Sequence, residues 1–235
     1  MNFLISILLA PLPSIVWLAF YLRKDKHPEP NRMVIKIFLL GVLMVPVAGI
    51  LEQLLFIGSE KVPVYNKLSL IIIGFALIEE VLKFLVIKFW VLKNPEFDEP
   101  VDAMIYMIIA ALGFAAAENI YLASQLNSLV SPLEFMITRF LGATFLHALA
   151  SGIIGYFLAA SLLMFSKIRK ILVLGGIFAA TILHSIFNYI IILNSQQVIG
   201  DIGRNLYLLI LLATMAVIVS IMFKKINKYR SICKI

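Results

Sequence analysis

The stretch from Leu68 to Leu92, LSLIIIGFALIEEVLKFLVIKFWVL, decides the fold class of this chain. A helix needs about 20 mostly apolar residues to cross the roughly 30 Å hydrocarbon core of a bilayer, and this run is long enough to do so. Its interior nevertheless carries three charged side chains, Glu79, Glu80 and Lys83. The stretch therefore predicts a membrane-spanning helix with ionisable groups inside the hydrocarbon region.

The composition of the whole chain supports a membrane protein. Of its 235 residues, 62% are hydrophobic and only 14% are charged, and the mean hydropathy is +1.03. A soluble domain has about half of its residues apolar and about a quarter charged. A soluble enzyme, a secreted disulfide scaffold and a disordered regulator are thereby excluded. The single cysteine, Cys233, can form neither an internal disulfide nor a cysteine-based zinc site.

Apolar runs of spanning length recur along the chain, separated by turn-forming and charged segments. We expect one all-α transmembrane domain over residues 1–235, a polytopic bundle of about seven membrane helices with no separate soluble domain. The expected spans are Phe3–Leu22, Val34–Ile57, Leu68–Leu92, Val101–Ala123, Arg139–Phe165, Ile171–Leu193 and Leu206–Phe223.

The basic residues predict the orientation, because cytoplasmic loops carry an excess of Lys and Arg. Fifteen lie in or beside the first, third and fifth loops and the C-terminal tail, against four on the other side, Lys61, Lys67, Arg139 and Arg204. We expect the N-terminus outside and the C-terminus in the cytoplasm, with the first span retained as an anchor. The net charge of +7 then reflects contact with anionic lipid, and no nucleic-acid partner is expected.

Few polar side chains remain within the spans, and an acid at membrane depth is a functional candidate by default. A buried Glu–Lys pair or a hydrogen-bonded histidine can also be purely structural, but this collection exceeds what one packing pair requires. Glu52 and Gln53 are expected near the outer membrane interface and are weaker candidates for the site. The complete set is Glu52, Gln53, Glu79, Glu80, Lys83, Glu118, Asn119, His147, His184 and Asn188.

Several of these residues are expected at similar depths below the outer boundary of the membrane. At a rise of about 1.5 Å per residue, Glu79 lies about 17 Å below the outer boundary. The same arithmetic puts Glu118 about 8 Å, His147 about 12 Å and His184 about 14 Å deep. Four helices thus bring polar groups to the outer half of the bilayer, which predicts one water-accessible site.

Carboxylates with imidazoles suit general-base activation of water beside a polarised carbonyl, and therefore hydrolysis of an amide. Metal, serine and aspartyl designs lack their usual motifs: there is no HExxH and no GxSxG, and the four Asp lie in loops or at a span edge. A His/Glu metal cluster stays open, since both side chains are ligands. We expect a site without metal or other cofactor.

At these residues the chain resembles the PrsW family, glutamic-type intramembrane proteases distantly related to CAAX prenyl proteases. Glu79-Glu80-Val-Leu-Lys83 is similar to that family's EExxK motif. Three segments match in the same order, Phe114-Ala-Ala-Ala-Glu118-Asn119, FLHALASG around His147, and His184-Ser-Ile-Phe-Asn188. The loop sequence His27-Pro-Glu-Pro30 is also similar, so the resemblance runs from the first loop through the sixth span.

The resemblance implies a peptidase of the prokaryotic cytoplasmic membrane that cuts a single-span partner near the outer face. That partner would be an anti-sigma factor in an envelope-stress pathway. Glu79 and Glu80 would activate water, with Lys83 as their ion partner and Phe114 and Asn119 in support. His184 and Asn188 would stabilise the oxyanion, as in the HxxxN motif of CAAX proteases.

One position departs from the wider superfamily, whose second motif commonly ends in His where this chain has Glu118. His147 is then the candidate for the water-activating imidazole, and the division of roles between His147 and His184 stays open. Glu118 is either a third catalytic carboxylate or a group that orients a histidine.

Three alternatives remain. Carboxylates and histidines in spans also build the proton relays of transporters and channels. The fold could be a binding or immunity-type protein without activity, or it could cleave prenylated tails as CAAX peptidases do. The sequence makes no prediction of oligomeric state.

Overall fold

The computed structural model describes residues 2–24, 27–61, 63–125 and 131–229, and within these ranges the chain is helical without a strand. The all-α fold class is confirmed. The elements are α1 (Asn2–Leu9), α2 (Leu12–Leu22), α3 (Asn31–Gly58), η1 (Ser59–Lys61), α4 (Val64–Trp90), α5 (Pro100–Ser124), α6 (Pro132–Leu141), α7 (Ala143–Leu162), α8 (Ser166–Ser195) and α9 (Asp201–Ile226).

Six helical segments in the described ranges are long and apolar enough to cross a membrane, where about seven were expected. They are Leu4–Leu22, Asn31–Lys61, Pro100–Ser124, Pro132–Leu162, Lys167–Ser195 and Asp201–Ile226. The difference is α4, which covers the expected span Leu68–Leu92 except for its last two residues. It is 27 residues long, but Glu79, Glu80 and Lys83 make it more charged than an ordinary membrane helix.

The expected span from Arg139 to Phe165 is two helices instead of one. The chain leaves helical geometry at Gly142, whose φ of −105° and ψ of −109° separate α6 from α7. A Cβ at this position would lie 2.6 Å from the carbonyl oxygen of Thr138, so only glycine fits the break. Arg139 consequently lies in the last turn of α6, before the helix that carries His147.

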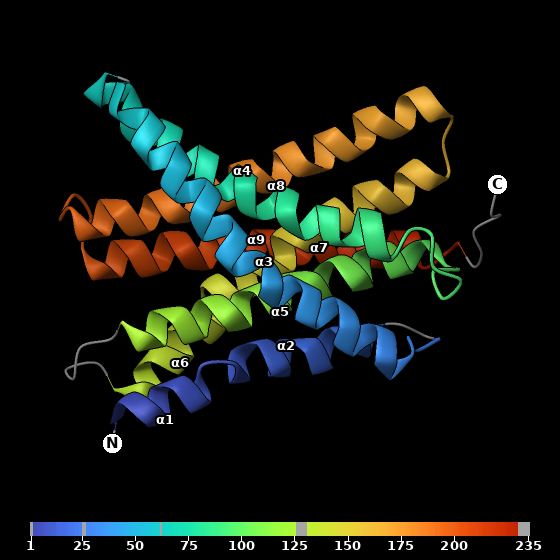
Figure 1. Cartoon of the computed structure of the whole chain (residues 1–235), viewed down its shortest axis with the longest axis horizontal. Helices are drawn as coiled ribbons and strands as arrows, with labels where there is room; N and C mark the ends of the chain where they lie inside the picture. Colours follow the sequence, from blue (N-terminus) through green and yellow to red (C-terminus); the bar gives the residue numbers. More distant parts are fainter. Residues whose placement is uncertain (1, 25–26, 62, 126–130, 230–235) are drawn as a thin grey trace.

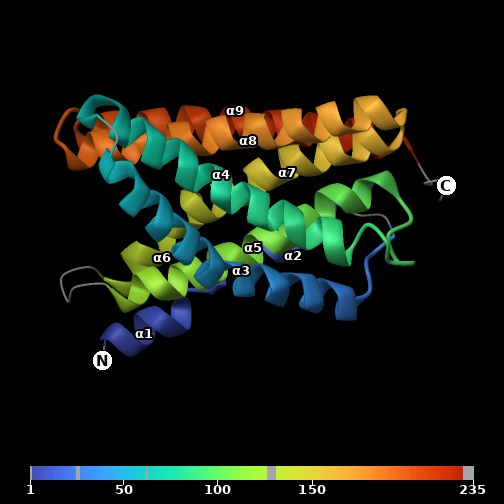
Figure 2. The same ribbon diagram turned by 45° about the horizontal axis from the view of Figure 1, so that its top comes forward.

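The long helices run between the two ends of the molecule (Figure 1). Helices α3, α5 and α8 end on the left of the view, and α2, α4, α7 and α9 end on the right. Helix α5 lies in the interior of the bundle, where α3, α7 and α2 pack against it, and Figure 2 shows α8 and α9 on the side away from α1. Every residue of α5 from Pro100 to Ala116 is buried.

Glycines allow this close packing around α5. A Cβ at Gly113 of α5 would lie 2.0 Å from the carbonyl oxygen of Phe38, and one at Gly41 of α3 would lie 2.1 Å from that of Ala110. On the other side, a Cβ at Gly155 of α7 would lie 2.5 Å from the Cα of Met104. Small residues let membrane helices approach to backbone contact, where lipid gives no hydrophobic drive for association. The packing fixes the end of α5, which carries Glu118, against its neighbours.

The structure predicts that Gly113→Ala destabilises the bundle. The added methyl group meets backbone atoms of α3, and overpacking of this kind costs about 1–3 kcal/mol. The control is Gly175→Ala in α8, where a Cβ would meet nothing within 4 Å. Thermal unfolding in detergent should show a lower midpoint for Gly113→Ala alone. Equal midpoints for both variants and the wild type would contradict the close contact between α3 and α5.

Candidate functional site

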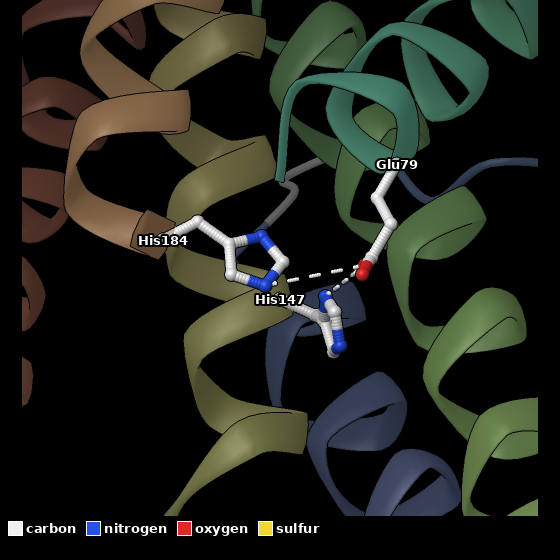
Figure 3. Close-up of side chains that lie close together, drawn as sticks. All are labelled: Glu79, His147 and His184. Atoms are coloured by element: carbon white, nitrogen blue, oxygen red, sulfur yellow. Dashed lines mark ion pairs between the residues drawn. The ribbon is translucent and has the colours of Figure 1, made fainter. Parts of the chain in front are cut away.

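Four helices bring the charged and polar side chains of the predicted site together. Helix α4 contributes Glu79, Glu80 and Lys83, α5 contributes Glu118, α7 contributes His147, and α8 contributes His184. Figure 3 shows Glu79, His147 and His184 pointing toward one another. These residues are far apart in sequence, and the convergence expected from their depths is present in the structure.

Lys83 lies at the centre of this cluster and is fully buried. Its Nζ is 2.9 Å from Oε1 of Glu80 and 3.4 Å from Oε2 of Glu79, one helical turn earlier on α4. It also lies 2.8 Å from Nδ1 of His147 and 4.6 Å from the ring centroid of Phe114. A buried charge is tolerated only when it is paired, and the i,i+3 and i,i+4 spacing supplies two anionic partners.

The two adjacent glutamates have different surroundings. Glu80 is fully buried, and its carboxylate accepts hydrogen bonds from Lys83, from Nδ1 of His184 at 2.9 Å and from the Ser151 hydroxyl at 3.2 Å. The Glu79 side chain keeps 12% of its surface exposed. Glu80 is therefore committed to hydrogen bonds within the protein, whereas the Glu79 carboxylate, which also accepts from Lys83, is only partly enclosed.

The hydrogen-bond partners assign the protons of both imidazoles. An ammonium group only donates, so Nδ1 of His147 accepts from Lys83 and Nε2 carries the proton. That Nε2–H donates to Oε2 of Glu118 at 3.1 Å. A neutral His184 has the reverse order, with Nδ1–H donating to Glu80 and the lone pair on Nε2. The unprotonated nitrogens are Nδ1 of His147, 3.8 Å from Oε2 of Glu79, and Nε2 of His184, 4.0 Å from the same oxygen.

This arrangement fits a divalent metal ion. Glu79, His147 and His184 each offer one ligand atom, and these atoms lie within 4.8 Å of one another. Two imidazoles with one carboxylate are a known ligand set for catalytic zinc. The protonated nitrogen of each histidine is held by a second carboxylate, as in metal sites generally. Lys83 fits a metal site less well. Its ammonium already donates to Nδ1 of His147, the nitrogen that would have to bind the ion.

Glu118 extends the site toward α6. Its Oε2 also accepts from Nη2 of Arg139 at 2.5 Å. The Nε–H of Arg139 donates to Oδ1 of Asn119, whose Nδ2 donates to Oγ1 of Thr144 at 3.0 Å. Sequence reasoning missed Arg139, Thr144 and Ser151. Ser151 lies one turn after His147 within the quoted FLHALASG segment, so helical spacing could have found it.

Two further candidates lie at the margin of the cluster. Asn188 is half-buried on α8 one turn after His184, and within the described part of the chain its side chain makes no hydrogen bond. Glu52 of α3 is half-buried and interacts electrostatically with Glu79 and Glu118, closer to the site than the sequence indicated. Gln53 is exposed.

The chain is similar to known proteins of one family. Residues 29–221 match the family model described as PrsW family intramembrane metalloprotease. A Protease PrsW of Geobacillus kaustophilus is 32% identical over 74% of this chain and 73% of its own length. Proteins of the same name from Oceanobacillus iheyensis and Bacillus subtilis are 31% and 29% identical, over 80% and 76% of this chain and 84% and 79% of their own lengths.

No solved structure matches the chain. The family match covers most of the sequence and includes all four helices of the site. The chain therefore belongs to the PrsW protease family.

Proposed function

We propose that this protein is a membrane-embedded endopeptidase that hydrolyses a peptide bond in a single-span membrane protein. The observation that carries the proposal is the convergence of the partly exposed Glu79 carboxylate on Nδ1 of His147 and Nε2 of His184. Membership of a protease family supports this function over a transporter, and the relatives' name supports it over a CAAX-type peptidase.

We propose seven crossings within one domain, with the N-terminus outside. Helix α4 supports this count because it runs between the same two ends of the molecule as its neighbours (Figure 1). Its charges are paired with one another and with side chains of α7 and α8, so they need not face lipid. The excess of basic residues in the odd-numbered loops supports the orientation. The substrate would then be cut near the outer face of a bacterial cytoplasmic membrane, as an anti-sigma factor would be.

The residues of the site have two roles: one group acts on water, and the other holds the first group in place. Without a bound cation, Glu79 takes the proton of the attacking water, because its carboxylate is only partly enclosed and lies beside both imidazoles. Glu80 and Glu118 hold His184 and His147 through their protonated nitrogens, and Lys83 balances the charge of the carboxylates. Asn188 lies at the margin and would donate to the developing oxyanion.

We further propose that Glu79, His147 and His184 hold a divalent cation such as zinc. A bound cation would polarise the scissile carbonyl and make water a stronger acid. The two histidine–carboxylate pairs support this class, because they fix the ring nitrogens that a metal needs unprotonated. The metal-free glutamic class expected from the sequence is the second candidate, and the contact of Lys83 with Nδ1 of His147 favours it.

Substitution of the two adjacent glutamates should have different effects. Glu79→Gln should lower cleavage by about a hundredfold or more, the contribution of a general base, with little change in thermal stability. Glu80→Gln should lower both cleavage and thermal stability, because removing one partner of a buried ion pair costs about 3–5 kcal/mol. The measurements are cleavage of a panel of single-span model proteins in liposomes and thermal unfolding in detergent.

The matched control for both variants is Glu60→Gln, an exposed glutamate of η1. It should retain wild-type cleavage and stability. Wild-type cleavage by Glu79→Gln would contradict its role in activating water. If Glu79→Gln were destabilised as much as Glu80→Gln, the two carboxylates would instead be equivalent members of a structural ion pair.

A strong chelator should abolish cleavage by the purified wild-type protein, and stoichiometric zinc should restore it. The reason is that three ligand atoms lie within 4.8 Å of one another on rigid helices. Metal content per protein, measured by elemental analysis, should be about one in the wild type and should fall in His147→Ala and His184→Ala. Full cleavage by metal-depleted protein would reject the metal class in favour of the glutamic class.

A further inference from the structure

We propose that Arg139 is a positioning residue for His147, and that it acts through Glu118 to fix which imidazole nitrogen faces Glu79. The inference deepens the proposed function and rests on it for its effect on catalysis. Its structural part, the proton position on His147, needs no substrate and is tested on metal-depleted protein, because a cation on Nδ1 would itself hold the proton on Nε2.

The guanidinium group of Arg139 holds two successive residues of α5. Its Nη2 lies 2.5 Å from Oε2 of Glu118, the same oxygen that accepts the Nε2–H of His147 at 3.1 Å. Its Nε–H donates to Oδ1 of Asn119. Only 15% of the Arg139 side chain is exposed. Because a guanidinium is planar and presents its donors in a fixed fork, two acceptors set the orientation of the group and of the Glu118 carboxylate.

A second chain of contacts returns from Asn119 to α7. The buried Asn119 amide donates to Oγ1 of Thr144 at 3.0 Å. Thr144 precedes His147 by three residues and therefore lies on the same face of α7. Arg139 thus connects the end of α5 to the turn of α7 that carries His147, next to the helix break at Gly142. The position of the imidazole ring and that of its hydrogen-bond acceptor are fixed by one side chain.

The proton position of His147 depends on this acceptor. A neutral imidazole carries its proton on either nitrogen, and the hydrogen bond at one nitrogen decides the state of the other. The Glu118 side chain is 28% exposed, so without Arg139 its carboxylate can turn toward water. His147 then loses the acceptor for Nε2–H, and the form with a proton on Nδ1 becomes populated. In that form Nδ1 can neither accept from Lys83 nor face Glu79 with a lone pair.

The test uses the fact that the chain has only three histidines. Metal-depleted protein labelled with ¹⁵N-histidine is studied in liposomes by solid-state NMR, which distinguishes protonated from unprotonated ring nitrogens. The wild type should show Nε2–H for His147 and Nδ1–H for His184, and His27→Asn removes the third signal. Arg139→Gln and Glu118→Gln should both convert His147 to a mixture of tautomers, whereas Arg139→Lys should retain part of the wild-type signal.

The matched control is Arg204→Gln. Arg204 also lies near a helix end and pairs with Asp201 at 3.2 Å and with Asn194 at 2.8 Å, outside the site. This variant should leave all histidine signals and cleavage unchanged. A wild-type tautomer of His147 in Arg139→Gln would overturn the proposal, and so would the Nδ1–H form in the wild type.

Kinetics on the model substrate that the wild type cleaves fastest give the second readout. Arg139→Gln should lower kcat about 10- to 100-fold, as loss of an outer hydrogen-bond partner does, with KM unchanged. The double variant Arg139→Gln/Glu118→Gln should be no slower than Glu118→Gln alone, because the two residues act in series. Additive losses would overturn the proposed route through Glu118.

The two proposals fail in different ways. If Glu79→Gln were inactive while Arg139→Gln retained both the wild-type kcat and the wild-type tautomer, only the positioning role would be lost. If Glu79→Gln cleaved normally, the proposed function would fail, and the NMR measurement would still decide the position of the proton on His147.

Discussion

Burial of the Lys83 ammonium is the constraint on which the rest of the site depends. A charge without counter-charges in the interior of a membrane protein costs several kcal/mol, so Lys83 requires anionic and hydrogen-bonding partners from several directions. Glu79 and Glu80 supply two of them on the same helix, and His147 supplies a third from α7. Together with the hydrogen bond between His184 and Glu80, these contacts bring α4, α7 and α8 to one point, and the charges make α4 the exception among the long apolar helices.

The packing of α5 and the polar cluster support each other. Backbone contact at Gly41 and Gly113 holds α5 against α3, and contact at Gly155 holds it against α7. The close approach fixes the backbone of α5 against that of α7, while Arg139 and His147 hold the Glu118 carboxylate itself. Each histidine then has one nitrogen held by a carboxylate and the other directed toward Glu79. A water-activating site needs this kind of fixed geometry, since its supporting contacts must be in place before the substrate arrives.

Much of this arrangement could be predicted from the sequence. What could not be predicted are the contacts between residues far apart along the chain. Hydropathy gave the helical class, and helical spacing gave the pairing of Lys83 with its two glutamates, because both depend on neighbours within one helix. The helix break at Gly142 was not predicted, since the flanking residues are apolar on both sides. Because the break was not predicted, Arg139 was expected at the end of a membrane span. No pattern in the neighbouring sequence indicated its contact with Glu118, which lies 21 residues away. The different exposure of Glu79 and Glu80 likewise depends on α7 and α8, which a single helix does not show.

The most direct test of the account is to map the cut that the purified protein makes in a single-span substrate, with the reaction run in ¹⁸O-labelled water. Mass spectrometry of the products gives both the position of the cut and the source of the new carboxyl oxygen. The account predicts ¹⁸O at the new C-terminus and a cut in or just beyond the outer half of the substrate's span. Products without ¹⁸O, or a cut on the cytoplasmic side, would contradict water activation by a site in the outer half of the membrane.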